Sequence, residues 1–285
     1  MNQLIVFIQK LLPHHPLSRL MQTITRIRLP LFKNTFIRIF IRLYNVDMSE
    51  AVQPEPEHYP HFNGFFTREL RPEARPVIDK TNTIACPVDG TVSQAGPIRN
   101  GQIFQAKGFD YSLTNLLGGA ADMAGLFHNG SFATLYLSPR DYHRIHMPLA
   151  GQLQETIYVP GRLFSVNRRT THHLPDLFAR NERLVTLFDT EAGPMALVLV
   201  GALFVSGIET VWGGMITRPH ATPQRQRFRQ GIETPVTLER GQEMGRFNMG
   251  STVIALFDQG VTMADDLKAD TPVQMGQLLS HLNNQ

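Results

Sequence analysis

"RFNMGSTVIALF", residues 246–257, joins a Gly-Ser-Thr motif to an apolar run rich in β-branched residues. The run TVIALF is typical of a buried β-strand, and the glycine is typical of the turn before one. A serine entering a strand is poorly placed to receive an outside substrate. Ser251 is well placed, however, to attack the backbone carbonyl of Gly250, because glycine tolerates strained dihedrals and shields its carbonyl least.

Similar apolar runs recur along the chain, separated by glycine and proline. They are 131–139 (SFATLYLSP), 183–190 (RLVTLFDT) and 195–212 (MALVLVGALFVSGIETVW). Such runs predict β-strands. In the body, only 111–119 (YSLTNLLGG) has a strong helical pattern, and it ends in a glycine stop. We therefore expect an α+β fold, in which a largely antiparallel β body carries an N-terminal amphipathic helical arm.

The chain divides near residue 48. Residues 48–60 are polar and rich in proline, as is typical of a linker, and FNGFFTREL (62–70) predicts a short helix after it. We expect an arm at 1–47 and a β-rich catalytic domain at 48–285. A length of 285 residues, 42% of them hydrophobic, is enough for a sizeable core. Cys86 is the only cysteine, which excludes an intramolecular disulfide and is typical of a small buried side chain.

The arm is basic and apolar. Residues 1–46 contain seven Lys or Arg and no acidic residue, so the remainder of this +3 chain carries −4. Asn34 is a candidate N-cap for a helix with one apolar face. That face would comprise Phe36, Ile37, Phe40, Ile41 and Tyr44. Arg38 and Arg42 would line its polar edge.

A basic arm on an acidic body indicates an anionic partner. No apolar run reaches the roughly 18 residues that span a bilayer, so we expect a helix lying in the interface of an anionic membrane. The alternative is a helical hairpin packed on the body or on a second subunit. Nucleic acid is disfavoured, because large aliphatic residues interleave the basic ones.

Two polar motifs in the body are candidates for chemistry. CPVDGTV (86–92) contains Asp89, and an Asp-Gly pair between apolar residues is also typical of a hairpin turn. LSPRDYHRIHMPLAG (137–151) contains His143 and His146 in a loop-like stretch between prolines. No zinc ligands beyond these two histidines are evident in the sequence, so no metal is expected.

Asp, His and Ser together indicate nucleophilic catalysis, in which the carboxylate of Asp89 would orient a histidine and that histidine would deprotonate Ser251. The G-x-S-x-G elbow of hydrolases is absent. Two alternatives stay open. One is a membrane-associated serine hydrolase that uses Asp89, His146 and Ser251 without self-cleavage, and the other is a non-catalytic lipid-binding β module.

Several motifs, in this order along the chain, resemble the bacterial phosphatidylserine decarboxylase proenzyme family. They are CPVDG, DYHRIHMP, YVPGRLFSVN, FARNER, ALVLVGALFVSGIETVW, RGQEMGRF and MGST. The resemblance covers nearly the whole chain, arm included. The usual processing motif of the family is Leu-Gly-Ser-Thr, and Met249 replaces the leucine. This exchange conserves volume and apolarity, so we expect self-cleavage to persist.

The resemblance implies self-cleavage between Gly250 and Ser251 into a large chain, 1–250, and a small chain, 251–285. Ser251 would become a covalent pyruvoyl cofactor that forms a Schiff base with the amine of phosphatidylserine. The pyruvoyl group would accept the electrons left when CO₂ departs. The product of this decarboxylation would be phosphatidylethanolamine. The resemblance assigns His143 as the proton donor in decarboxylation and His146 mainly to self-cleavage.

The resemblance also implies the partners. They are phosphatidylserine, an anionic membrane surface and the protein's own small chain, with further dimerisation left open. The expected location is the cytoplasmic face of the cell membrane, bound peripherally. Other pyruvoyl decarboxylases act on soluble amino acids and would not need an apolar arm.

Overall fold

The computed structural model describes residues 2–106, 108–203, 207–216, 222–228 and 235–283. Its central feature is a nine-stranded sheet in the order β12-β7-β8-β9-β15-β5-β2-β17, with β13 also paired to β7. The strands are β2 (Gly90–Pro97), β5 (Ser131–Leu137), β7 (Gly151–Val159), β8 (Arg183–Thr190), β9 (Gly193–Gly201), β12 (Gln224–Arg227), β13 (Thr237–Leu238), β15 (Ser251–Phe257) and β17 (Pro272–Val273). All named strand pairs between described residues are antiparallel.

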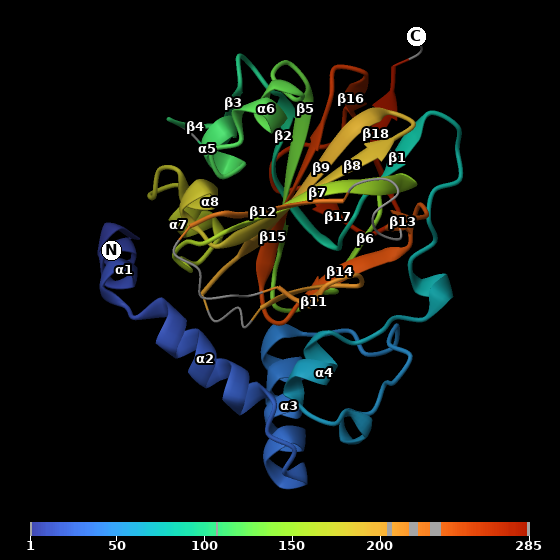
Figure 1. The fold of residues 1–285 in the computed structure, drawn as a ribbon. Helices are drawn as coiled ribbons and strands as arrows, with labels where there is room; N and C mark the ends of the chain where they lie inside the picture. Colours follow the sequence, from blue (N-terminus) through green and yellow to red (C-terminus); the bar gives the residue numbers. More distant parts are fainter. Residues whose placement is uncertain (1, 107, 204–206, 217–221, 229–234, 284–285) are drawn as a thin grey trace.

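Three smaller sheets complete the β structure. A four-stranded sheet has the order β11-β10-β14-β6, a three-stranded sheet has the order β1-β18-β16, and β3 pairs with β4. The strands are β1 (Thr83–Ala85), β3 (Gln102–Ala106), β4 (Phe109–Ser112), β6 (Arg144–His146), β10 (Ile208–Thr210), β11 (Gly214–Met215), β14 (Glu243–Phe247), β16 (Val261–Met263) and β18 (Leu278–Leu282). With the helices, these sheets confirm the α+β prediction (Figure 1).

Strand β15 lies in the middle of the central sheet. It pairs along its whole length with β5 on one side and β9 on the other, and Ser251 is its first residue. Side chains alternate between the two faces of a strand. Val253 lies in one core cluster, together with Ile145 and Phe247 of the four-stranded sheet. Ser251 therefore points toward the face that carries β6 and β14.

Short helices cover the opposite face, where Ile254 and Leu256 lie in a second core cluster. These helices are α5 (Leu113–Leu116), α6 (Ala121–Gly125), α7 (Arg168–Thr171) and α8 (Leu177–Arg180). The side chains of β15 alternate between the two faces of the sheet, so they contribute to both clusters. The middle of the central sheet is thus buried on both faces, which explains the nearly continuous apolar runs of its inner strands.

Three helices form the arm: α1 (Asn2–Leu11), α2 (His14–Thr25) and α3 (Pro30–Tyr44). The α1–α2 junction contacts the segment that precedes α7. There the Ser165 amide donates to Gln9 Oε1 at 2.9 Å, and the Leu163 amide donates to His14 Nδ1 at 3.1 Å. The His14 ring also lies edge-on to Phe164. Figure 1 shows α1 and α2 along one flank of the body and α3 beneath its β11–β14 end.

Helix α3 differs from the prediction in its start and in its inward face. Pro30 occupies the first turn, so the helix begins before Asn34, and Asn34 is not its N-cap. The face predicted to meet lipid packs inward on α4 (Phe62–Phe66), where Ile37 is fully buried. The outward face is apolar as well: Leu31, Ile39 and Leu43 are 85%, 56% and 70% exposed.

Two basic side chains of the arm interact with Glu57. Lys33 is buried and donates to the Glu57 carbonyl at 2.9 Å, while Arg38 pairs with the Glu57 carboxylate. No helix between described residues is both long and apolar enough to cross a bilayer.

Other sequence predictions divide between confirmed and wrong. The strands predicted at 131–139, 183–190 and 251–257 are confirmed as β5, β8 and β15. The run 195–212 contains β9 and β10, and its residues 204–206 lie outside the described part. The hairpin interpretation of Asp89-Gly90 was wrong, because β1 and β2 belong to different sheets. The helix at 111–119 shrinks to α5, since the residues before it pair as β4 with β3.

Candidate active site

Ser251 lies at the point where the chain enters the central sheet. It is fully buried, and no hydrogen-bond partner for its Oγ occurs among the described residues. An unpartnered buried hydroxyl is costly, and such atoms call for an explanation. A nucleophile that acts on its own chain, or a group formed from that serine, fits this environment.

The peptide before Ser251 is strained. Met249 has a φ of 123°, a backbone conformation that residues with a Cβ rarely adopt. The sequence prediction placed the tolerance for strain at Gly250, but the unusual φ belongs to its neighbour. A Cβ built on Gly250 would meet no described heavy atom within 4 Å. Open space at the Cβ position, rather than tight packing, thus surrounds Gly250.

His143 is buried with one free ring nitrogen. Its Nδ1 lies 2.8 Å from the Asp141 carbonyl oxygen, which can only accept, so Nδ1 carries the proton of the neutral ring. Its Nε2 has no partner in the part of the chain that the structure describes. The ring lies 4.1 Å from that of Phe66, and burial lowers the pKa of His143 to about 3. His143 is therefore neutral at pH 7, with an available Nε2 lone pair.

His146 has partners at both ring nitrogens. Nδ1 donates to the Gly241 carbonyl oxygen at 2.8 Å, and Nε2 lies 3.0 Å from the Tyr142 hydroxyl. Burial lowers the pKa of His146, and the Gly241 hydrogen bond and the Glu243 carboxylate oppose that shift. The ring is thus neutral at pH 7, and Tyr142 donates to the nitrogen that would act as a base.

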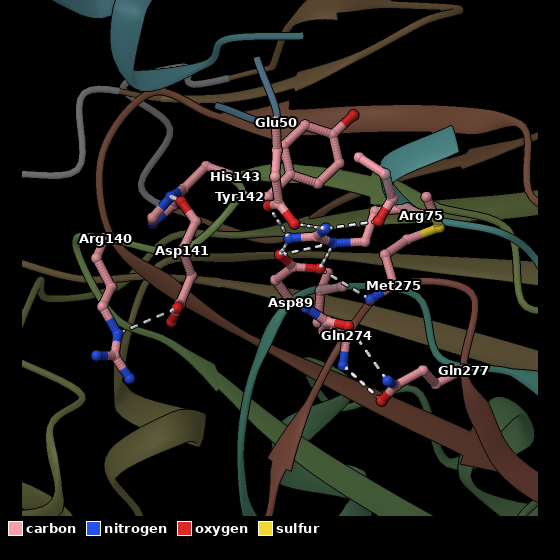
Figure 2. Close-up of polar contacts among 12 residues, drawn as sticks. Glu50, Arg75, Asp89, Arg140, Asp141, Tyr142, His143, Gln274, Met275 and Gln277 are labelled. Atoms are coloured by element: carbon pink, nitrogen blue, oxygen red, sulfur yellow. Dashed lines mark hydrogen bonds and ion pairs between the residues drawn. The ribbon is translucent and has the colours of Figure 1, made fainter. Parts of the chain in front are cut away.

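Asp89 interacts with Arg75 rather than directly with a histidine. Arg75 donates to both oxygens of Asp89, with Nε–Oδ1 2.8 Å and Nη2–Oδ2 2.6 Å, and the Met275 amide donates to Oδ1 at 2.9 Å. Arg75 also bonds Glu50, so one guanidinium joins two carboxylates (Figure 2). No described hydrogen bond joins Asp89 to His146, but the Asp89 charge opposes the lowering of the His146 pKa by burial.

The four-stranded sheet brings the histidines to the segment that contains the Gly250–Ser251 bond. Strand β6, with His146, pairs with β14, and the Phe247 amide donates to the His143 carbonyl at 3.0 Å. Phe247 lies four residues before Ser251. Both candidate histidines and the candidate nucleophile thus share one end of the molecule, and Asp89 lies just before β2 at the same end.

Sequence reasoning missed two functional candidates. Tyr142 lies inside the DYHRIHMP motif, four residues before His146, and that proximity was a usable signal. Arg75 lies in a proline-flanked stretch, and no local pattern pointed to it. No cluster of three metal-ligating side chains occurs among the described residues.

Comparison with known proteins identifies the family. A family model described as phosphatidylserine decarboxylase matches residues 62–281, and a second, described as PSD, matches residues 4–45. Proteins named phosphatidylserine decarboxylase proenzyme from Pseudomonas paraeruginosa (strain PA7) and Pseudomonas putida (strain F1) are each 54% identical over 280 residues. The match covers 98% of this chain and 97% and 98% of theirs, respectively. The chain therefore belongs to the phosphatidylserine decarboxylase family.

Proposed function

We propose that this chain cleaves itself between Gly250 and Ser251 and then decarboxylates phosphatidylserine to phosphatidylethanolamine with the pyruvoyl group formed from Ser251. The observation that carries the proposal is the position of Ser251. Its buried Oγ has no described partner, and it follows a strained Met249 and an unobstructed Gly250. The comparisons favour neither the serine hydrolase nor the non-catalytic lipid-binding module.

Self-cleavage begins when Ser251 Oγ loses its proton to His146 and attacks the Gly250 carbonyl carbon. The leaving nitrogen of residue 251 takes the proton from His146 as the C–N bond breaks, and the amide becomes an ester. β-Elimination then removes the Cα proton of residue 251 and breaks its Cβ–O bond, which releases the carboxylate of Gly250 and leaves dehydroalanine, an enamine that tautomerises to an imine. Water hydrolyses the resulting imine, so ammonia leaves and a pyruvoyl group remains.

The proposed roles of the ionisable side chains follow from their contacts. The Gly241 carbonyl fixes the His146 tautomer that leaves Nε2 as the base. Asp89, held by Arg75, acts through its charge and favours the protonated form of His146. This favourable charge helps the histidine to hold a proton during self-cleavage, without a direct hydrogen bond.

In decarboxylation, the pyruvoyl group supplies the electron sink that pyridoxal cofactors supply elsewhere. Neutral His143 takes a proton at Nε2 from the substrate ammonium and returns it to the α-carbon after CO₂ leaves. The ring of Phe66 packs on that of His143, which is fully buried. A positioned proton donor of this kind typically contributes about 10²–10⁴ in rate.

The small chain would stay bound after cleavage. Residues 251–257 pair on both sides within the central sheet, and β18 pairs with β1 of the large chain. Removing β15 would expose apolar side chains from both core clusters. The two chains would therefore remain one folded unit.

The arm would hold the site at an anionic lipid surface. Its exposed apolar residues include Leu29, Leu31, Phe32, Ile39 and Leu43. Arg26, Arg28 and Arg42 are exposed on the same arm, and each basic residue near an anionic leaflet contributes about 1 kcal/mol. The inward face of α3 packs on α4, whose Phe66 contacts His143. Helix α3 would thus lie between the lipid surface and the active site. This arrangement suits a membrane-borne substrate.

Intact-mass analysis of purified protein tests the proposal. We expect two chains, 1–250 and 251–285, the second lighter than its encoded mass by one ammonia and reactive with hydrazines. Ser251→Ala should remain a single inactive chain. Ser280→Ala is the matched control, because Ser280 is also fully buried with an unpartnered Oγ among described residues. A single unmodified 285-residue chain in active wild-type protein would refute the proposal.

A further inference from the structure

The three residues before Gly250 are each held by a different contact. The Phe247 amide donates to the His143 carbonyl, the Asn248 side chain accepts from Asn63, and the Met249 side chain packs on the α3–α4 aromatic cluster. A side chain at Gly250 would meet open space among the described residues. Beyond it, residues 251–257 are held in the central sheet. The Gly250–Ser251 bond thus spans two independently anchored parts.

The contact between Asn63 and Asn248 is the most specific of these anchors. Asn63 Nδ2 donates to Asn248 Oδ1 at 2.7 Å, across 185 residues of sequence. Asn63 is 7% exposed and Asn248 is 1% exposed. The Asn248 amide also donates to the Gly207 carbonyl at 3.0 Å, so backbone and side chain of this residue are both held. Asn63 Oδ1 has no partner among the described residues, so the bond to Asn248 is what holds the Asn63 side chain, and its loss would leave further buried polar groups unsatisfied.

The strained backbone lies next to this pair. A non-glycine residue in a sparsely populated region persists only when its surroundings over-determine it. Here Asn63 holds residue 248, the cluster holds the Met249 side chain, and β15 holds the chain from Ser251 onward. The cluster is formed by Ile37, Val46, Tyr59, Phe62, Phe65 and Phe66.

We propose that α4 acts as a clamp on the Gly250–Ser251 bond, with Asn63 as a positioning residue for self-cleavage that acts through Asn248. The inference rests on the proposed function. It assigns α4, on which the arm helix α3 packs, a role in forming the cofactor. Asn63 does not act on substrate, so its loss slows self-cleavage while each pyruvoyl group, once formed, works at its normal rate.

The test follows self-cleavage of newly made protein. Wild type, Asn63→Ala, Asn248→Ala and the double variant are synthesised in a cell-free system, and chain separation is followed with time. We expect each single variant to cleave about tenfold more slowly, the effect of losing one buried hydrogen bond. The double variant should be no slower than Asn248→Ala alone, because Asn63 acts only through Asn248. Decarboxylation per hydrazine-titrated pyruvoyl group should stay within about twofold of wild type.

Thr186→Val is the matched control, since it removes a buried hydrogen bond to the Leu197 carbonyl elsewhere in the central sheet. Denaturant unfolding of each variant in a Ser251→Ala background measures the loss of precursor stability. Thr186→Val should cleave at the wild-type rate. Asn63→Ser, which keeps a polar group of smaller size, replaces Asn63→Ala if the latter fails to fold, and it should also slow cleavage.

Three results would overturn the clamp. They are wild-type cleavage by the Asn63 variants, additive slowing in the double variant, and equal slowing by Thr186→Val at equal stability. If the proposed function itself were wrong, the wild-type protein would form no second chain and no hydrazine-reactive group. That result is distinct from the three above.

Discussion

Nδ1 of His146 donates to the carbonyl oxygen of Gly241 across 2.8 Å. A carbonyl oxygen cannot donate, so this contact selects the tautomer in which Nε2 carries the lone pair. The Tyr142 hydroxyl, 3.0 Å away, then donates to Nε2. The general base of the proposed self-cleavage is therefore oriented from one side and stabilised in its neutral form from the other.

Tyr142→Phe removes the donor to Nε2 and leaves the ring in place. The neutral form of His146 loses a hydrogen bond, so the pKa of His146 rises. The acid limb of the self-cleavage pH profile should move to higher pH by up to about one unit, the equivalent of one hydrogen bond. Cleavage rates of newly synthesised protein between pH 5 and 8 measure the shift. An unchanged profile would contradict the assignment of Nε2 as the base.

Met249→Gly relieves the unusual φ and removes the side chain from the aromatic cluster. If strain of about 1–3 kcal/mol is released on the way to the transition state, glycine should slow self-cleavage about tenfold or more. Met249→Leu keeps the backbone restriction and the apolar contact, so it should cleave at nearly the wild-type rate. Equal rates for the glycine and leucine variants would show that the φ of residue 249 has no part in cleavage.

His143 makes the precursor sensitive to acid. Its pKa is about 3 when folded and about 6.5 when unfolded, so below pH 6.5 the unfolded chain binds more protons. Stability is complete above pH 6.5 and falls as the pH drops toward 3. This group alone should cost about 2 kcal/mol between pH 6.5 and 5.

The measurement is urea unfolding of the Ser251→Ala precursor against pH, with and without His143→Gln. The glutamine variant does not titrate, so its stability should fall less steeply over the same range. The lowered pKa of His146 acts in the same direction, so some slope should remain. Parallel curves would mean that His143 is not buried as a neutral ring.

The outward face of α3 can be tested separately from the inward face. Leu31→Ser, Ile39→Ser and Leu43→Ser combined remove exposed apolar surface without touching the Met249 cluster. Binding to vesicles containing an anionic lipid should weaken by about tenfold or more, while self-cleavage stays at the wild-type rate. Val211→Ser is the control, because Val211 is 51% exposed but lies on the body. Unchanged vesicle binding by the triple variant would exclude this face as the membrane contact.

Local sequence predicted much of the β body. The runs that became β5, β8 and β15 are dense in β-branched and aliphatic residues, which favour strands whatever their neighbours. The motif at 246–257 also placed Ser251 at the start of a buried strand. These features depend on residues close together in the chain, so pattern alone was sufficient for them.

Tertiary structure decided the rest. Helix α3 is apolar on two faces, and periodicity cannot tell which one packs on α4. Asp89 pairs with Arg75, and Asn63 with Asn248, because folding brings together segments with no local signal for each other. The φ of Met249 likewise results from anchors on both sides of the Gly250–Ser251 bond. The sequence by itself determined which serine enters the central sheet; only long-range packing decided how the bond before it is held, because that geometry is imposed by contacts distant in sequence.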